Sequence, residues 1–287
     1  MPKLQRILIG LATLVLLVSG CVLVSPGHFV LTPTPSLGDF SISPADGMTM
    51  IFIPKGGFPM GSETGLTDER PVHNVFLDNF WIDKTEVTNA MYKMCVKSGS
   101  CKPPDVTTFF NDPNYSHYPV VNVSWADAEK YCEWAGRRLP TEAEWEKAAS
   151  WDPVDANKRT YPWGNGFDCG RGNFEGASCD GYEGTAPVGS FPSGASPYGV
   201  MDMGGNVWEW VHDAFLETDP LVGGTKNYYS ISPASNPQGV DPSITIYRVM
   251  RGGGWKINFG FGRSSYRLWF GLDDSYDFAG FRCAASP

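Results

Sequence analysis

Charged residues, basic residues and histidines are all scarce in this sequence. Only 18% of its 287 residues are charged, and 22 Lys and Arg stand against 31 Asp and Glu, for a formal net charge of −9. Few charges beside 14% aromatic residues exclude the composition of a disordered chain. The lack of a basic patch argues against a nucleic-acid partner, because phosphate binding needs clustered Lys and Arg. The 4 histidines are scattered, without the spacing of a helical metal site.

Glycine, proline and tryptophan are abundant. The 33 Gly and 23 Pro make up about a fifth of the chain, against about 12% in an average protein. Both residue types break helices, so a bundle of long helices is excluded. The chain also has 10 Trp, and it is long enough for one large domain or two small ones. We therefore expect a compact domain with much irregular backbone, held together by aromatic packing.

The first 20 residues have the pattern of an export signal. Two basic residues precede an apolar run over residues 7–18, and a Ser-Gly pair stands before Cys21. The segment resembles a bacterial lipobox, which implies that residues 1–20 are removed and that Cys21 is lipidated. The alternative is an uncleaved anchor, since about 18 apolar residues just span a bilayer. Either way we expect an exported chain, and lipidation would anchor it at the outer face of a membrane in the cell envelope.

Residues 21–46 are rich in Pro, Ser and Thr without apolar periodicity, so we expect an extended tether there. The folded domain should occupy residues 47–287. Ser124 and Thr141 each precede an acidic residue by three positions, which predicts two helices that begin with capping boxes. A further helix is expected from Thr85. The predicted strands are residues 48–54, 72–82, 207–211 and 247–251. A few helices beside scattered strands indicate an α+β domain.

The chain has 7 cysteines, which in an exported protein indicate disulfides. With Cys21 lipidated, the even remainder favours three bridges and no free thiol. The candidate pairs are Cys95–Cys101 and Cys169–Cys179 across short loops, and Cys132–Cys283 over long range. Spacing alone does not decide the connectivity, because six cysteines allow fifteen pairings. The sequence contains no CxxC motif, which is the spacing typical of redox and zinc sites.

Several segments along the chain together resemble one family. They are residues 53–62 (IPKGGFPMGS), 119–125 (PVVNVSW), 138–146 (RLPTEAEWE), 204–210 (GGNVWEW), 251–255 (RGGGW) and 280–283 (GFRC). The combination is similar to the formylglycine-generating enzyme, or sulfatase-modifying factor, superfamily over about residues 48–284. This resemblance implies an α+β fold related to C-type lectins and a disulfide between Cys132 and Cys283. The family's oxidases convert a sulfatase cysteine to formylglycine with copper and dioxygen.

The copper ligands of those oxidases are missing. The oxidases have a serine just before the Trp of the Arg-Gly-Gly motif and cysteines two and seven positions after that Trp. Here these positions are Gly254, Ile257 and Gly262. Cu(I) prefers thiolate ligands, and neither Ile nor Gly supplies one. The sequence therefore favours neither a copper cofactor nor the family's oxidase activity.

The family's calcium-type positions are better matched. One site maps onto Asn173, Phe174, Asp180 and Tyr182, and a second maps onto Asp202, Gly205, Val207 and Glu209. Ca²⁺ prefers such a mixture of carboxylate, amide and carbonyl oxygens. The resemblance thus implies a structural calcium that crosslinks loops. Without the resemblance, these acids would be turn and capping residues.

Residues 256–278 interleave aromatic residues with arginines, which are enriched at binding hot spots. The predicted binding surface comprises Trp208, Trp255, Arg263, Arg267 and Trp269, although aromatic residues also fill cores. We interpret the chain as a tethered, calcium-stabilised, non-catalytic module that binds an extracytoplasmic protein, peptide or glycan. Two alternatives stay open: an active formylglycine-generating oxidase, and a receptor diversified by a retroelement.

Overall fold

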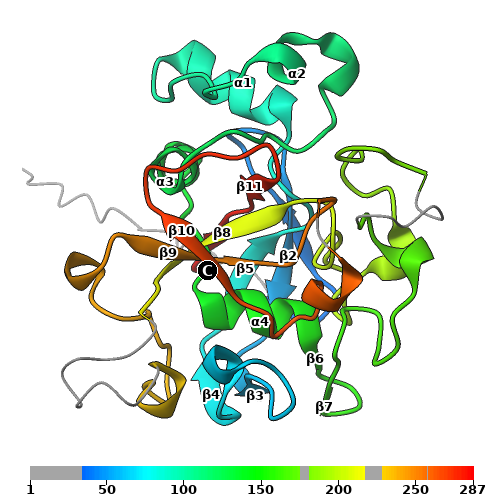
Figure 1. Cartoon of the computed structure of the whole chain (residues 1–287), viewed down its shortest axis with the longest axis vertical. Helices are drawn as coiled ribbons and strands as arrows, with labels where there is room; N and C mark the ends of the chain where they lie inside the picture. The colour runs from blue at the N-terminus through cyan, green and yellow to red at the C-terminus, as the bar shows by residue number, and fades with distance from the viewer. Residues whose placement is uncertain (1–33, 175–180, 217–227, 257) are drawn as a thin grey trace, which may run out of the picture. The chain divides into compact units, whose positions relative to one another are not determined.

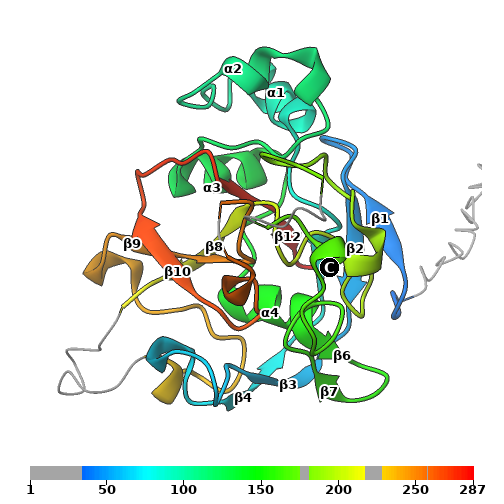
Figure 2. The same cartoon turned by 45° about the vertical axis from the view of Figure 1, so that its right-hand side comes forward.

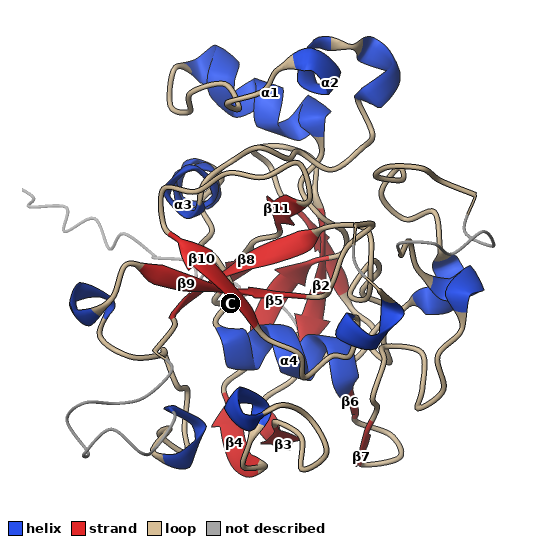
Figure 3. Ribbon diagram, viewed as in Figure 1, coloured by secondary structure: helices blue, strands red, loops and turns tan. Residues whose placement is uncertain are grey.

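Short strands and helices joined by long loops make up the part of the chain that the structure describes (Figures 1 and 3). This computed structural model describes residues 34–174, 181–216, 228–256 and 258–287, and residues from Pro35 onward form one unit. The strands are β1 (Phe40–Ile42), β2 (Thr49–Ile53), β3 (Gly56–Met60), β4 (His73–Leu77), β5 (Phe80–Asp83), β6 (Trp151–Asp152), β7 (Asn157–Lys158), β8 (Trp208–Ala214), β9 (Tyr247–Arg251), β10 (Leu268–Gly271), β11 (Ala279–Phe281) and β12 (Ala284–Ala285). The α-helices are α1 (Asn89–Ser98), α2 (Thr108–Asn111), α3 (Trp125–Trp134) and α4 (Glu142–Ser150).

Single 3₁₀ turns punctuate the loops. They are η1 (Thr67–Glu69), η2 (Pro113–Tyr115), η3 (Cys169–Arg171), η4 (Pro192–Gly194), η6 (Tyr228–Ser230), η7 (Pro242–Ile244) and η8 (Phe259–Phe261). Across the described ranges, no helix is long and apolar enough to cross a membrane.

The two ends of the domain meet in one antiparallel sheet, in the order β1-β2-β5-β12. β12 pairs with β5, and Cys283 just before β12 is disulfide-bonded to Cys132 on α3. This sheet corrects the predicted tether. β1 pairs with β2, and the buried Asp46 forms an ion pair with Arg137, so the last residues of the predicted tether belong to the folded domain. A three-residue strand has too little pattern to be predicted before its partner is known.

A second four-stranded sheet has the order β10-β9-β8-β11. β9 has the predicted bounds of residues 247–251, whereas β8 overlaps the prediction at residues 207–211 but begins at Trp208 and extends to Ala214. The two strands pair antiparallel. β10 pairs antiparallel with β9, and β11 joins β8 in parallel. Consequently the C-terminal ends of β8 and β10 and the N-terminal end of β9 lie at the same end of this sheet.

Both predicted capping boxes are present. Ser124 Oγ accepts from the backbone N–H of Asp127 at the start of α3, and Thr141 Oγ1 accepts from that of Glu144 at the start of α4. Every residue of α4 is buried, because the helix contacts the β3–β4 pair and the strands β8 and β9. Figure 2 shows α4 between these two groups of strands. Trp145 of α4 is fully buried in the core that they enclose.

The helix expected from Thr85 begins later than predicted. α1 starts at Asn89 with Thr88 as its N-cap. The backbone N–H of Val87 instead donates to Phe281 O, which ties this segment to β11. A contact between distant parts of the chain thus overrides the helical pattern.

Two of the three predicted disulfides are present in the described residues. Cys95–Cys101 closes the loop after α1, and Cys132–Cys283 joins α3 to the C-terminal end of the domain. The third predicted pair includes Cys179, which lies outside the described residues, so it stays a prediction. Cys21 also lies outside them.

Candidate functional site

An aromatic ring packs against Gly262, a position where the family's oxidases have a copper-ligating cysteine. A β-carbon on Gly262 would lie 2.7 Å from Phe174 Cζ and closer still to Cε1. Phe174 is 2% exposed and meets Phe167 and Trp163 edge-on, at ring-centroid distances of 5.6 and 6.4 Å. Ile257 lies outside the described residues. Position 262 therefore has neither a thiolate nor, in this arrangement, room for one.

Three buried carboxylates share one arginine beside β8. Glu209 accepts from Nε and Nη2 of Arg282, at 2.6 Å for each oxygen. Within the described residues Glu86 and Asp202 form no ion pair of their own, and Glu86 Oε2 has no hydrogen-bond partner. Burial raises the pKa of Glu86 well above its usual value, and the neighbouring Asp202 carboxylate raises it further. Burial raises the pKa of Asp202 as well. The group thus has more acids than its single cation can neutralise.

Three residues of the second predicted calcium set, Asp202, Gly205 and Val207, lie in the segment that leads into β8. The fourth, Glu209, lies on β8, and Arg282 donates to both of its carboxylate oxygens. Asp202 and Gly205 have positive φ values of 59° and 93°, so the chain turns sharply beside Glu86. Among the described residues, no three His, Cys, Asp or Glu side chains are arranged to hold a metal ion. A cation here would therefore need backbone carbonyl oxygens, such as those the resemblance implies at Gly205 and Val207. The unpartnered oxygen of Glu86 is an additional donor of the kind that Ca²⁺ prefers, so the donor chemistry fits this ion.

The first predicted calcium set is only partly described. Asn173 is buried, and its Nδ2 donates to Gly184 O at 2.8 Å. Phe174 follows it in the chain, and Tyr182 is 38% exposed. Asp180, the predicted carboxylate ligand, lies outside the described residues. This set stays a prediction.

Two of the residues predicted to line a binding surface lie in the interior instead. Trp208 is 1% exposed. Arg267 is 4% exposed, and its Nε and Nη2 donate to the two carboxylate oxygens of Glu142 at 2.6 and 2.8 Å. Buried arginines are stable only when such a partner compensates the lost hydration. Both residues are therefore part of the protein interior, and neither lines a binding surface.

The other three predicted residues reach the surface at separate places. Trp255 is half-buried, with Lys256 Nζ 4.8 Å from the centroid of its ring. Arg263 lines a small polar pocket, and Trp269 lines a larger apolar one. These three residues of the predicted binding surface therefore lie at separate places and do not form one site.

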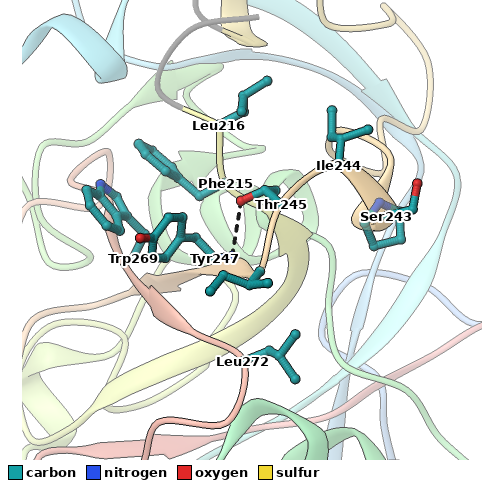
Figure 4. Close-up of a pocket in the computed structure, with 10 residues that line it drawn as sticks. Phe215, Leu216, Ser243, Ile244, Thr245, Tyr247, Trp269 and Leu272 are labelled. Atoms are coloured by element: carbon teal, nitrogen blue, oxygen red, sulfur yellow. Dashed lines mark hydrogen bonds between the residues drawn. The ribbon is translucent and has the colours of Figure 1, made fainter.

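The pocket at Trp269 lies at the end of the second sheet and has a volume of about 540 Å³ (Figure 4). Phe215 follows β8, Tyr247 begins β9 and Trp269 lies on β10. Trp269 stacks on Phe215, with ring centroids 5.1 Å apart, and meets Tyr247 edge-on at 4.7 Å. Trp269 and Tyr247 are 37% and 41% exposed, whereas Phe215 is 3% exposed. The buried Phe215 therefore supports Trp269 from the protein interior, whereas Trp269 and Tyr247 are open to solvent.

The opposite walls of this pocket are aliphatic, with a few hydroxyl groups. Figure 4 shows Ile244 across from the aromatic residues and Leu272 below them. Ser243 and Thr245 also line it, and Thr245 Oγ1 accepts from the backbone N–H of Tyr247 at 3.1 Å. The volume falls within the roughly 300–1,000 Å³ of small-ligand sites, which are also mostly apolar with few polar groups.

The profile of the sulfatase-modifying factor enzyme 1-like domain matches residues 38–287. The chain belongs to this family. Among its curated relatives, the formylglycine-generating enzyme of Streptomyces coelicolor is 33% identical, over 81% of this chain and 87% of that protein. The hercynine oxygenase of Mycolicibacterium smegmatis is 34% identical, over 77% of this chain and 57% of that protein. The serine/threonine-protein kinase pkn1 of Chlamydia caviae is 37% identical over 72% of this chain.

The chain matches only part of the length of several relatives. It spans 33% of the Chlamydia kinase-named protein and 57% of the hercynine oxygenase. Among solved structures, PvdO from Pseudomonas aeruginosa has a TM-score of 0.72 and 28% identity, and the match covers 88% of this chain and 100% of that chain. Treponema denticola variable protein 1 shares the fold, with a TM-score of 0.65 at 20% identity over 87% of this chain and 99% of that chain. The predicted α+β sulfatase-modifying-factor fold is confirmed.

Several residues of these sites were not predicted from the sequence. Glu86 carries no motif that distinguishes it from a surface acid. Phe215 directly follows β8 and Tyr247 begins β9, and only the sheet brings them to Trp269.

Proposed function

We propose that this protein is a non-catalytic binding module of the family, which recognises an extracytoplasmic peptide, protein or glycan at the Trp269 pocket. The packing of Phe174 against Gly262 carries the non-catalytic part of this proposal. An oxidase that binds Cu(I) needs thiolates at positions 257 and 262, and the sequence has Ile and Gly there. The ring of Phe174 also takes the space of any side chain at position 262.

The Trp269 pocket supports the binding part of the proposal. Exposed apolar side chains surround it, with Ile244 at 45% and Ile246 at 62% exposure. Burying rigid aromatic and aliphatic surface is favourable by about 25 cal/mol per Å², and aromatic anchors in pockets dominate binding energies. A ligand would cover Trp269 and Tyr247, which the fold leaves half open.

One experiment separates this function from the oxidase alternative. The full-length protein, loaded with copper in air, is incubated with a cysteine-containing sulfatase peptide, and mass spectrometry follows conversion of the cysteine to the aldehyde. We expect no conversion under conditions in which an active family oxidase converts the peptide. Conversion by this protein would refute the non-catalytic function.

The binding function is tested with peptide and glycan arrays. We expect saturable binding that Trp269→Ala weakens at least about tenfold. Phe40→Ala is a matched control, since Phe40 is a 66% exposed aromatic residue on β1 of the other sheet. Absence of saturable binding, or an equal effect of the two substitutions, would contradict a role for the pocket.

We also propose a structural Ca²⁺ among Glu86, Asp202 and the chain that leads into β8. The unpartnered oxygen of Glu86 and the excess of buried acids support it. Saturating calcium at 100 times its Kd stabilises the fold by about 2.7 kcal/mol, so chelation should lower Tm. Glu86→Gln should reduce that response, whereas Glu133→Gln, at an exposed site on α3, should not. Equal Tm values in calcium and in chelator would refute the site.

The lipid anchor at Cys21 and the export of the chain remain part of this proposal. The basic residues, the apolar run and the Ser-Gly-Cys sequence support them. The mass of the N-terminal peptide and membrane fractionation of Cys21→Ser test them. An unmodified Cys21 in the mature chain would refute lipidation.

A further inference from the structure

A small polar pocket of about 130 Å³ lies beside β7 and shares no lining residue with the Trp269 pocket. Its lining includes three cations, Lys158, Arg159 and Arg263. Hydroxyl residues such as Ser62, Thr160 and Ser265 complete it. Three separate parts of the chain thus bring cations and hydroxyl groups together, in a sequence whose net charge is −9.

The carboxylates that balance two of these cations lie behind them, away from the solvent. Lys158 Nζ is 2.6 Å from Glu146 Oε1, and the two side chains are 17% and 0% exposed. Arg263 Nη2 is 2.7 Å from Glu69 Oε1, with side-chain exposures of 26% and 0%. None of the residues that line this pocket is an acid. The pocket therefore presents cations to the solvent and keeps their counter-charges in the interior.

The remaining cation follows the same arrangement. Arg159 pairs with Asp152, and the side chains are 27% and 8% exposed. Asp152 also accepts from the backbone N–H groups of Val154 and Asp155 at 3.0 and 3.2 Å. Both of these bonds reach Oδ1, whereas Arg159 Nη2 donates to Oδ2. Arg159 can therefore bind a ligand through its other N–H groups while it keeps the bond that satisfies this buried acid.

Each cation keeps unused donors after its internal bonds. The ammonium of Lys158 donates to Gly61 O and Glu146, which uses two of its three N–H groups. Arg263 donates to Gly260 O and Glu69, and Arg159 donates to Pro162 O and Asp152. A guanidinium has five N–H groups, so both arginines keep donors for a ligand rich in acceptors.

We propose that this pocket binds a tetrahedral oxyanion, the sulfate or phosphate group of a ligand. Arginine forks and a lysine, converging from different elements, match an acceptor with oxygens on several sides. The volume lies below the roughly 300 Å³ at which drug-sized sites begin, which suits one such group. The site is independent of the aromatic pocket, so it stands even if the proposed function fails.

The test titrates inorganic sulfate, phosphate and acetate into the full-length protein at low ionic strength and measures affinity by calorimetry. We expect saturable binding of sulfate or phosphate that exceeds binding of planar acetate and weakens as salt rises. Saturable binding with sulfate stronger than phosphate points to sulfate esters, and the reverse order points to phosphate esters. Absence of saturable binding, or acetate binding as tightly as both tetrahedral anions, would overturn the proposal.

Variants locate the site. Arg159→Gln should weaken binding roughly tenfold, because hydrogen bonds to charged groups are strong. Arg263→Lys keeps the positive charge beside Glu69 but loses the planar guanidinium and its several N–H donors, so it should also weaken binding. Lys130→Gln, at an exposed lysine of α3, and Trp269→Ala should leave the affinity unchanged. Unchanged affinity in Arg159→Gln and Arg263→Lys, with both variants folded, would refute this site.

Discussion

Alanine at position 262 tests whether the ring of Phe174 fills the space that a copper ligand would need. The new methyl carbon would lie 2.7 Å from Phe174 Cζ, whereas carbon atoms pack best at about 3.5–4.0 Å. The ring has little room to retreat, because Phe167 and Trp163 pack against it. The backbone of Gly262 does not have a positive φ, so only this clash opposes alanine. We expect Gly262→Ala to lower the free energy of unfolding by about 1–3 kcal/mol.

A double-mutant cycle isolates that contact. Phe174→Ala alone should cost about 3–5 kcal/mol, because it leaves a cavity in a tightly packed site. In the double variant the methyl group enters this cavity. The loss of unfolding free energy should therefore be about 1–3 kcal/mol smaller than the sum of the losses in the two single variants. Urea unfolding with constant m-values gives each free energy.

Gly166→Ala is the matched control for this cycle. A β-carbon on Gly166 meets nothing within 4 Å, so its effect on the free energy of unfolding should be small and can be stabilising. Additive effects of Gly262→Ala and Phe174→Ala, or an equally small effect of Gly262→Ala and Gly166→Ala, would refute the packing argument.

Two further predictions concern stability. Replacing Cys132 and Cys283 by serine should cost up to about 5 kcal/mol in the loop-entropy picture, because the bridge closes a sequence separation of 151 residues. Opening the Cys95–Cys101 bridge, which closes a sequence separation of 6 residues, should lower the free energy of unfolding by only about 2 kcal/mol. Urea unfolding that gives the same loss of free energy for both bridges would contradict this picture. Burial lowers the pKa of Lys147 to about 8 from its usual 10.5. The unfolded chain then binds more protons between these values, so this lysine should make the protein more stable by about 3 kcal/mol as pH rises from 8 to 10.5. The difference in unfolding free energy between the native protein and Lys147→Met should follow that rise, and a flat difference would refute it.

Local features were predictable because their causes lie within a few residues. The capping boxes at Ser124 and Thr141 satisfy backbone N–H groups of their own first turn, so the sequence alone places both helix starts. The strand at residues 247–251 has the bounds that its pattern predicts. The α+β class followed from a few predicted helices beside scattered strands, and the family fold and the Cys132–Cys283 bridge followed from motifs spread along the chain.

The roles of individual side chains were decided by partners far away in the sequence. Arg267 is of a residue type that is enriched at binding hot spots. Its partner Glu142 lies 125 residues earlier in the chain, and the bidentate ion pair between them is buried. The Trp269 pocket exists because the sheet brings the ends of β8, β9 and β10 together. Phe174 covers Gly262 across 88 residues of chain, counted from their positions. The sequence by itself thus determined the family, the starts of α3 and α4 and the missing thiolates. Only the tertiary structure decided which aromatic and charged residues face a ligand, because burial and ion pairing depend on segments that meet on folding.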